Sequence, residues 1–187
     1  CIDPLSIGMY KASKAYICPK ADDSNFIDWV IDTANTESVD AILSGVEENI
    51  LKLAKNRHHI ENCTKSKVVC SDIDVLNITS DKLYTCQWLM GNGCNYPRFA
   101  NPDTDNIYSF INKVGLPAFA KPRNGKSSKG LIVIDNLDKL QDIPPNYVIQ
   151  EYLKDDDSEY SVGVYCDTRG NICGEISIYR YAMSAGY

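Results

Sequence analysis

The sequence has 187 residues, of which 44% are hydrophobic and 24% charged, and a net charge of -6 at pH 7. A chain of this length and apolar fraction can bury one good core or two small ones, which excludes the fibrous and disordered classes. Its basic residues are scattered rather than gathered in a stripe, which argues against nucleic-acid binding, and its apolar runs are too short to span a bilayer.

The first third of the chain alternates between helix and strand patterns. Residues 1–10 resemble the end of a strand already begun, so we expect the chain to be cut from a longer one. Apolar residues then recur with helical period behind a candidate N-cap, Ser24. A strand, helix and strand joined at short spacing predict a parallel sheet. The predicted elements are a helix over 24–35, a strand over 39–43, a helix over 46–57 and a strand over 67–71.

The middle of the chain has two helical patterns. The first begins at a candidate cap, Ser80, and stops at Gly91. The second has one apolar face and is ended by Gly115 and Pro117. We therefore predict a helical connector over residues 77–117.

From residue 118 the apolar period changes to that of strands, which short polar turns separate. Consecutive strands joined by such turns pair antiparallel, and one helix, 136–142, intervenes. The predicted fold is α/β, with a parallel lobe over 1–76, the connector, and a mostly antiparallel α+β lobe over 118–187. The predicted strands are 117–122, 131–135, 147–153, 159–166 and 172–180.

The eight cysteines and the two sequons at Asn62 and Asn77 would suit a secreted, disulfide-bonded protein. No two cysteines have C-x-x-C spacing, and several lie in apolar segments, where a thiol packs as a small hydrophobe. We therefore favour reduced cysteines and a cytoplasmic location. His58 and His59 lack the spacing from a cysteine pair that a zinc finger needs.

The segment with the clearest chemistry is "AKPRNGKSSKG", residues 120–130. Lys121 precedes a proline, which favours extended backbone, so its side chain should project from the end of a strand. The glycines and exposed amides that follow can fold over an oligophosphate. A P-loop is excluded, because Ala120 stands where its first glycine belongs and a strand pattern follows instead of a helix. A solvated hairpin tip is the plainer alternative.

Six short motifs stand in order along the chain, and together they resemble the ATP-grasp superfamily, most closely its carbamoyl-phosphate synthase large-chain-like members. Each motif is weak alone, but six at family spacing are specific, and the resemblance covers most of the chain. The motifs are "DK" at 81–82, "AKP" at 120–122, "GKSSKG" at 125–130, "QEYL" at 150–153, "EYSV" at 159–162 and "CDTRG" at 166–170.

The resemblance implies an ATP site between two antiparallel sheets. A lysine suits phosphate oxygens and a carboxylate suits neighbouring ribose hydroxyls. Three of these residues have plainer alternatives: a first-turn helix residue for Lys82, a solvent-facing strand start for Glu159, and a strand-end cap for Arg180. The implied residues are Lys82 and Lys121 on phosphates; Lys126, Ser127, Ser128, Lys129 and Gly130 as a lid; Gln150, Glu151, Tyr152 and Leu153 as the adenine hinge; Glu159 on ribose; and Arg180 on the acyl phosphate or substrate.

The family's magnesium ligands are missing from this sequence, although a triphosphate is poorly neutralised without metal. They belong on strands that would follow Tyr187, so we expect the metal-bearing end to be truncated and the fragment itself to be inactive. The implied cofactors are ATP and Mg²⁺. The acidic run 155–157 is expected to be a solvated hairpin turn.

By resemblance, the parent protein is an ATP-dependent ligase that activates a carboxylate or bicarbonate as an acyl phosphate for attack by an amine or ammonia. Its partners would be small-molecule carboxylate and amine substrates, and a homodimer is one assembly open to it. The alternative is a noncatalytic nucleotide-binding or regulatory module without the metal strand. A dinucleotide-binding oxidoreductase is a weaker third, because the sequence has no G-x-G-x-x-G.

Overall fold

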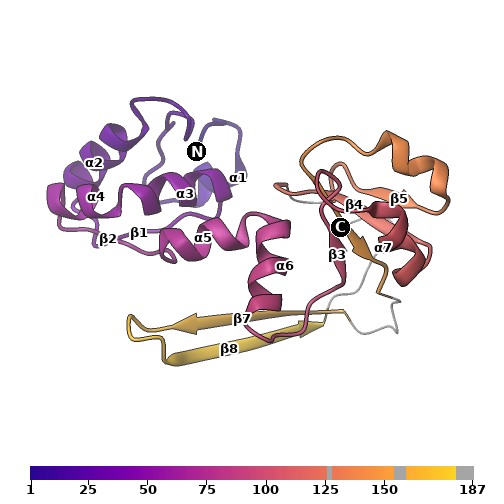
Figure 1. Ribbon diagram of the computed structural model, residues 1–187. Coiled ribbons are helices and arrows are strands. Elements are labelled where there is room, and N and C mark those ends of the chain that lie inside the picture. The colour runs from indigo at the N-terminus through magenta and orange to yellow at the C-terminus, as the bar shows by residue number, and fades with distance from the viewer. Residues whose placement is uncertain (126–127, 154–158, 180–187) are drawn as a thin grey trace. The chain divides into compact units, whose positions relative to one another are not determined.

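A computed structural model of the protein describes residues 1–125, 128–153 and 159–179 (Figure 1). The chain divides into two compact units, Cys1–Asn77 and Ile78–Tyr187. None of the helices that the structure describes is both long and apolar enough to cross a membrane.

The first unit is built on a short parallel pair of strands, as the sequence predicts: Ala41 lies opposite Lys67 and Ile42 opposite Val68. Helices pack an apolar core against this pair. The core residues are Phe26, Ile27, Val30, Leu53, Ile60 and Val68. The elements are α1 (Ile7–Lys11), α2 (Phe26–Glu37), β1 (Ala41–Ile42), α3 (Glu47–Lys55), α4 (Arg57–Cys63), β2 (Lys67–Val68) and α5 (Ile73–Thr79), the last of which crosses the boundary between the units.

Two expectations for this unit are wrong in detail. Residues 1–10 do not form the end of a strand, because the Asp3 carboxylate accepts a hydrogen bond from the Leu5 N–H at 2.8 Å and so starts the turn that leads into α1. The N-cap of α2 is Asn25 rather than Ser24, and its side chain makes no capping hydrogen bond.

The second unit is built on a four-stranded antiparallel sheet in the order β3-β6-β4-β5. The sequence predicts every strand of it except β3, whose two residues are too few to show an alternating pattern. Its elements are α6 (Lys82–Gly91), β3 (Phe99–Ala100), α7 (Ile107–Val114), β4 (Ala118–Pro122), β5 (Ile132–Ile134), the 3₁₀ helix η1 (Leu137–Asp142) and β6 (Tyr147–Glu151).

Strand β4 divides its side chains between two faces of the sheet. Ala118 and Ala120 are fully buried and join the core that packs against α7. Phe119 and Lys121 alternate with them and therefore point to the opposite face. Gln150 shares that face, because its Cα pairs with that of Phe119. The core face is completed by Ile111, Ile134 and Ile149.

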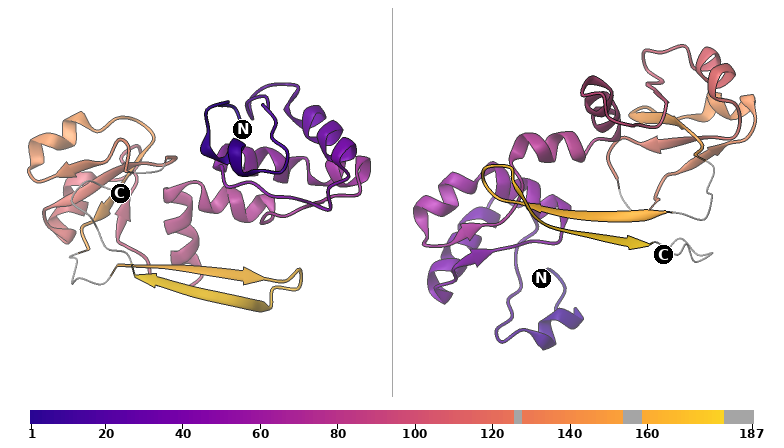
Figure 2. Two further views of the ribbon diagram at one scale, coloured as in Figure 1. Left: turned by 180° about the vertical axis from the view of Figure 1, so that it is seen from behind. Right: turned by 90° about the horizontal axis from the view of Figure 1, so that it is seen from below.

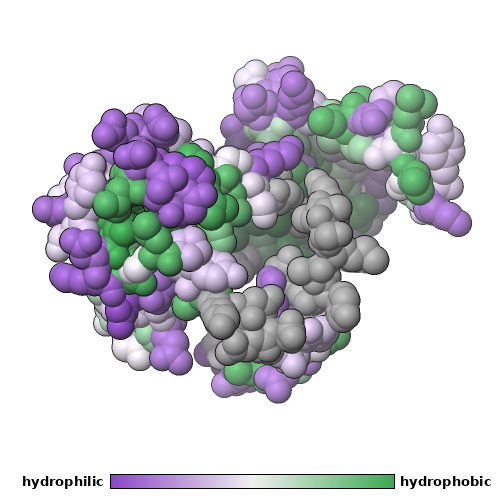
Figure 3. Space-filling model, turned by 90° about the vertical axis from the view of Figure 1, so that its right-hand side faces the viewer, coloured by the Kyte–Doolittle hydropathy of each residue, from purple (hydrophilic) through white to green (hydrophobic). Residues whose placement is uncertain are grey.

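The unit also contains the predicted antiparallel hairpin of β7 (Tyr160–Cys166) and β8 (Ile172–Tyr179), whose strands lie side by side in both views of Figure 2. At its turn the Asp167 carboxylate accepts hydrogen bonds from the backbone N–H groups of Arg169 and Asn171. Every residue of the two strands is exposed. Apolar side chains stand at the surface elsewhere too, as the green areas in Figure 3 show.

Gly130 gives a direct test of the turn that follows β4. Its φ is +75°, and a Cβ there would lie 2.9 Å from both Pro122 Cγ and the Tyr147 hydroxyl. We expect Gly130→Ala to destabilise this unit by about 2 kcal/mol, because backbone strain and a steric clash add. Amide hydrogen exchange in β4 and β6 measures the change. Gly174→Ala is the control, since its Cβ would meet open space, and equal effects of the two would contradict the argument.

Candidate functional site

The second unit has a pocket of about 420 Å³ beside the glycine-containing loop that follows β4. Five residues to which the resemblance assigns a role line it, together with four to which it assigns none. The first five are Lys82, Lys121, Ser128, Lys129 and Glu159; the others are Phe119, Pro122, Gly125 and Leu131.

The N-terminus of α6 brings Lys82 to this pocket. Asp81 caps the helix by accepting hydrogen bonds from the N–H groups of Leu83 and Tyr84, so the cap is one residue beyond the predicted Ser80. The Lys82 ammonium donates to the carbonyl oxygens of Pro122 at 3.0 Å and Gly125 at 2.9 Å. Lys82 is thus tied to the base of the loop through main-chain acceptors.

Asp81 also forms an ion pair with Arg123 on the loop, and we call the contacts of residues 81 and 82 with Arg123 the clamp. The guanidinium donates from Nε to Oδ2 at 3.0 Å and from Nη2 to Oδ2 at 2.6 Å. Burial alone would raise the pKa of Asp81, but the hydrogen bonds from Arg123 and from the helix N–H groups outweigh it and hold the pKa below its usual value. The Lys82 N–H donates to the Arg123 carbonyl at 2.9 Å, which closes the clamp.

Lys121 enters the pocket from β4, in the extended conformation that the following proline predicts. It is half-buried, and its ammonium donates to Gln150 Oε1 at 2.9 Å and lies 5.5 Å from the centre of the Phe119 ring. Burial lowers the pKa of Lys121, and the charge of Lys82 lowers it further. No ion pair joins either lysine to a carboxylate in the part of the chain described.

The other predicted residues that the structure describes are not part of the pocket lining. Gly130 shapes the loop, and Glu151 accepts a hydrogen bond from the Arg98 N–H at 2.7 Å, which ties β6 to the segment before β3. Tyr152 packs edge-on against Phe119 with ring centres 5.2 Å apart. Leu153 is 64% exposed. Three predicted residues, Lys126, Ser127 and Arg180, and the acidic run 155–157 lie outside the described residues.

Sequence reasoning missed some residues that shape this site. Phe119 could have been found from the period of two, because it stands two positions before Lys121 on one strand. Arg123 and Cys86 gave no local signal, since their partners Asp81 and Gln150 are 42 and 64 residues away. Such contacts follow only from the tertiary fold.

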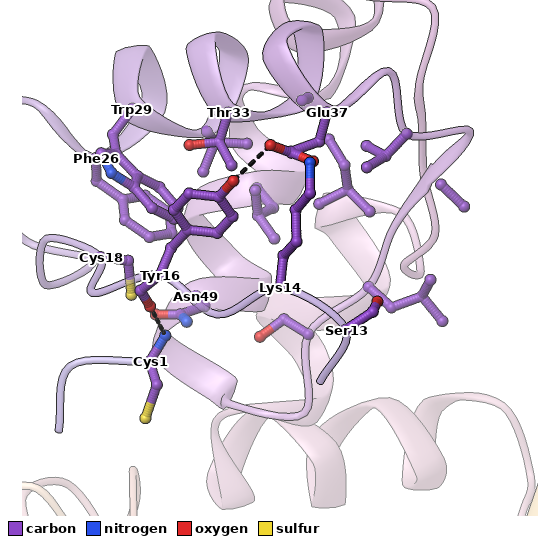
Figure 4. A pocket seen from close by; sticks show the side chains of 18 residues that line it. Cys1, Ser13, Lys14, Tyr16, Cys18, Phe26, Trp29, Thr33, Glu37 and Asn49 are labelled. Atoms are coloured by element: carbon purple, nitrogen blue, oxygen red, sulfur yellow. Dashed lines mark hydrogen bonds and ion pairs between the residues drawn. The ribbon is translucent and has the colours of Figure 1, made fainter. Parts of the chain in front are cut away.

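The first unit has a second pocket, of about 660 Å³, between its N-terminal segment and α2 (Figure 4). Apolar side chains such as Phe26 and Trp29 line much of it. The Glu37 carboxylate in it accepts hydrogen bonds from both the Lys14 ammonium and the Tyr16 hydroxyl. Lys14 therefore already has an anionic partner, unlike Lys82 and Lys121 in the described part of the second unit.

Comparison with known proteins agrees with the two-unit organisation. The ATP-grasp domain family matches residues 79–178, and the PylC-like N-terminal domain family matches residues 2–70. A carbamoyl-phosphate synthase from Methanobrevibacter smithii is 25% identical over 111 residues, which are 58% of this chain and 30% of that protein.

Two solved structures show the same fold at low identity. An ADP complex of PurK, an N5-carboxyaminoimidazole ribonucleotide synthetase, aligns with a TM-score of 0.72 and 12% identity over 98% of this chain and 47% of its own. The biotin carboxylase domain of the 2-oxoglutarate carboxylase from Hydrogenobacter thermophilus, in complex with MgADP, ADP and bicarbonate, aligns with a TM-score of 0.61 and 17% identity over 89% of this chain and 41% of its own.

Since the ATP-grasp match spans more than half of its residues, the protein belongs to the ATP-grasp domain family. The α/β fold, parallel in the first unit and antiparallel in the second, is the one that the sequence predicts. This chain spans less than half the length of each of these three proteins.

The clamp predicts a pH-dependent stability. We expect Asp81→Ala to destabilise the second unit by about 2–3 kcal/mol at neutral pH, because the helix loses its cap and Arg123 loses its partner. A carboxyl whose folded pKa is depressed stabilises above its unfolded pKa, about 4, and this contribution is lost as pH falls through the folded pKa. The difference from the unmodified protein in urea unfolding should therefore shrink at acid pH.

The matched control for this prediction is Asp135→Ala. Asp135 forms an exposed ion pair with Lys139 four residues along, and we expect little change at any pH. A pH-independent loss in Asp81→Ala would show that capping geometry matters and the charge does not.

Proposed function

We propose that the chain binds ATP in the pocket of its second unit, as part of an ATP-dependent ligase that forms carbon–nitrogen bonds. The observation that carries this proposal is the pair of ammonium groups on Lys82 and Lys121. One is held by carbonyl oxygens and the other by a side-chain amide, and these partners are neutral and do not compensate a positive charge. A half-buried cation with neutral partners is costly, and phosphate oxygens would compensate it.

The remaining lining residues suit other parts of a nucleotide. Ser128 and Lys129 offer a hydroxyl and a further ammonium on the loop, and Glu159 is proposed to accept hydrogen bonds from ribose hydroxyls. Lys126, Ser127 and Gly130 complete the proposed lid. The segment 150–153 is proposed as the adenine hinge, with its backbone groups reading the base edge. Arg180 is proposed to contact the acyl phosphate or the substrate.

The proposed reaction begins with transfer of a phosphoryl group from ATP to a carboxylate or bicarbonate, which gives ADP and an acyl or carboxy phosphate. An amine or ammonia then attacks the activated carbon; a C–N bond forms, the C–O bond to phosphate breaks and phosphate leaves. The chain would contribute positioning and charge stabilisation rather than a covalent intermediate. The resemblance to a carbamoyl-phosphate synthase and to a carboxylase described with bicarbonate supports this chemistry.

Magnesium is the expected companion of ATP in this proposal, but the described residues do not fit it. They contain no group of three or more His, Cys, Asp or Glu side chains that could hold a metal ion. Glu159 is the one carboxylate that lines the pocket in the described part of the chain. We therefore derive no step through a metal from these residues.

The second candidate, a nucleotide-binding module without turnover, is favoured by this lack of a metal cage among the described residues. The two functions differ in one measurement. A ligase releases ADP faster when its carboxylate or bicarbonate substrate is added, whereas a binding module does not.

The proposal also includes a homodimeric assembly and a cytoplasmic location.

The nucleotide site is tested by calorimetric titration of ADP in EDTA, so that the protein's own charges are measured alone. We expect Lys121→Ala to weaken ADP binding tenfold or more, about 1.4 kcal/mol, because a half-buried ammonium beside the phosphates is lost. Lys139→Ala, which removes a lysine from an exposed ion pair outside the pocket, should bind as the unmodified protein does. Tight binding that Lys121→Ala leaves intact would place the nucleotide elsewhere.

A further inference from the structure

We propose that Gln150 and Cys86 are positioning residues that hold the Lys121 ammonium in the pocket through neutral partners, so that its charge stays available to an anionic ligand. The nature of that ligand rests on the proposed function. The positioning itself does not, and it can be measured without any ligand.

Three elements meet at this point. Lys121 lies on β4, Gln150 on β6 and Cys86 on α6. The ammonium donates to Gln150 Oε1 at 2.9 Å, and Gln150 Nε2 donates to Cys86 Sγ at 3.1 Å. An ammonium has no acceptor, so the amide must turn its oxygen toward Lys121. Its NH₂ group then needs an acceptor on the other side, which the sulfur provides.

Burial of Gln150 and Cys86 restricts how their polar groups can be satisfied. Gln150 is 7% exposed and Cys86 is 2% exposed. A buried amide with either end unsatisfied costs free energy, so the two hydrogen bonds fix one orientation of the side chain. Cys86 stands four residues after Lys82 on α6, so one helix face presents both the sulfur and the second ammonium.

Neutrality distinguishes this arrangement from an ordinary buried ion pair. A glutamate at position 150 could accept the same hydrogen bond, but it would cancel the charge of Lys121 and repel phosphate. Burial raises the pKa of Cys86, so its thiol stays neutral as well. The charged groups that share the pocket with Lys121 in the described chain are Lys82, Lys129 and Glu159.

The first test follows the Lys121 amine by NMR titration of lysine side-chain signals in the full chain. The signal lost in Lys121→Arg assigns it. We expect Gln150→Glu to raise the Lys121 pKa by about one unit or more, because an opposite charge then lies within hydrogen-bonding distance. An unchanged titration would overturn the proposal, whether or not the protein binds nucleotide.

The second test asks whether Cys86 orients the amide. We expect Cys86→Ala to speed the hydrogen exchange of the Gln150 NH₂ group and to weaken ADP binding threefold or more. Cys86→Ser should restore both, since its hydroxyl oxygen is also an acceptor. Ile149→Val is the control, because it trims a fully buried neighbour on the opposite face of β6 and should change neither.

The outcomes separate the two proposals. If the unmodified protein does not bind ADP while the Lys121 titration moves as expected, the nucleotide site is wrong and the positioning stands. If ADP binds but Cys86→Ala and Cys86→Ser both behave as the unmodified protein does, Cys86 has no positioning role. Equal losses in the alanine and serine variants would show that packing, and not the hydrogen bond, is what Cys86 supplies.

Discussion

The main electrostatic constraint on the second unit is that the Lys121 ammonium is half-buried and lies in the same pocket as the Lys82 ammonium. Two like charges near each other in a partly desolvated site repel, and burial lowers the pKa of Lys121 accordingly. Neutral dipoles accept the hydrogen bonds of both ammonium groups: main-chain carbonyl oxygens bind Lys82, and a side-chain amide binds Lys121. The antiparallel sheet makes this possible, because fully buried alanines on the other face of β4 keep the strand against its core.

The position of α6 follows from the same requirement. Its capping residue, Asp81, binds Arg123 on the loop, while its first residue, Lys82, binds carbonyl groups of that loop. One carboxylate therefore satisfies the helix N-terminus and fixes the loop in a single arrangement. The loop and the pocket therefore differ in how their cations are compensated. The full anion–cation pair, Arg123 with Asp81, lies at the base of the loop. Among the residues that the structure describes, no ion pair joins Lys82 or Lys121 to a carboxylate.

The sequence predicts the fold well where patterns are local. The strand period from residue 118 and the proline after Lys121 are sufficient to place β4 and the Lys121 side chain that projects from it. The parallel strands of the first unit and the long hairpin are predicted equally well. Prediction from sequence fails where a contact with a residue distant in the sequence determines the local structure. Asp81 caps α6 in place of Ser80 and also binds Arg123, which is 42 residues away, and Gln150 bonds Lys121 from a strand 29 residues away.

The contacts of Lys82 have a consequence for how such a chain can change over evolutionary time. Its two acceptors are main-chain oxygens, which every amino acid carries. Those oxygens remain after any side-chain exchange that preserves the backbone path, whereas the contact between Arg123 and Asp81 depends on both side chains. Gln150 has no such latitude, since its role depends on a particular functional group. The contacts of Lys82 should accordingly tolerate mutational drift better than the contact between Lys121 and Gln150.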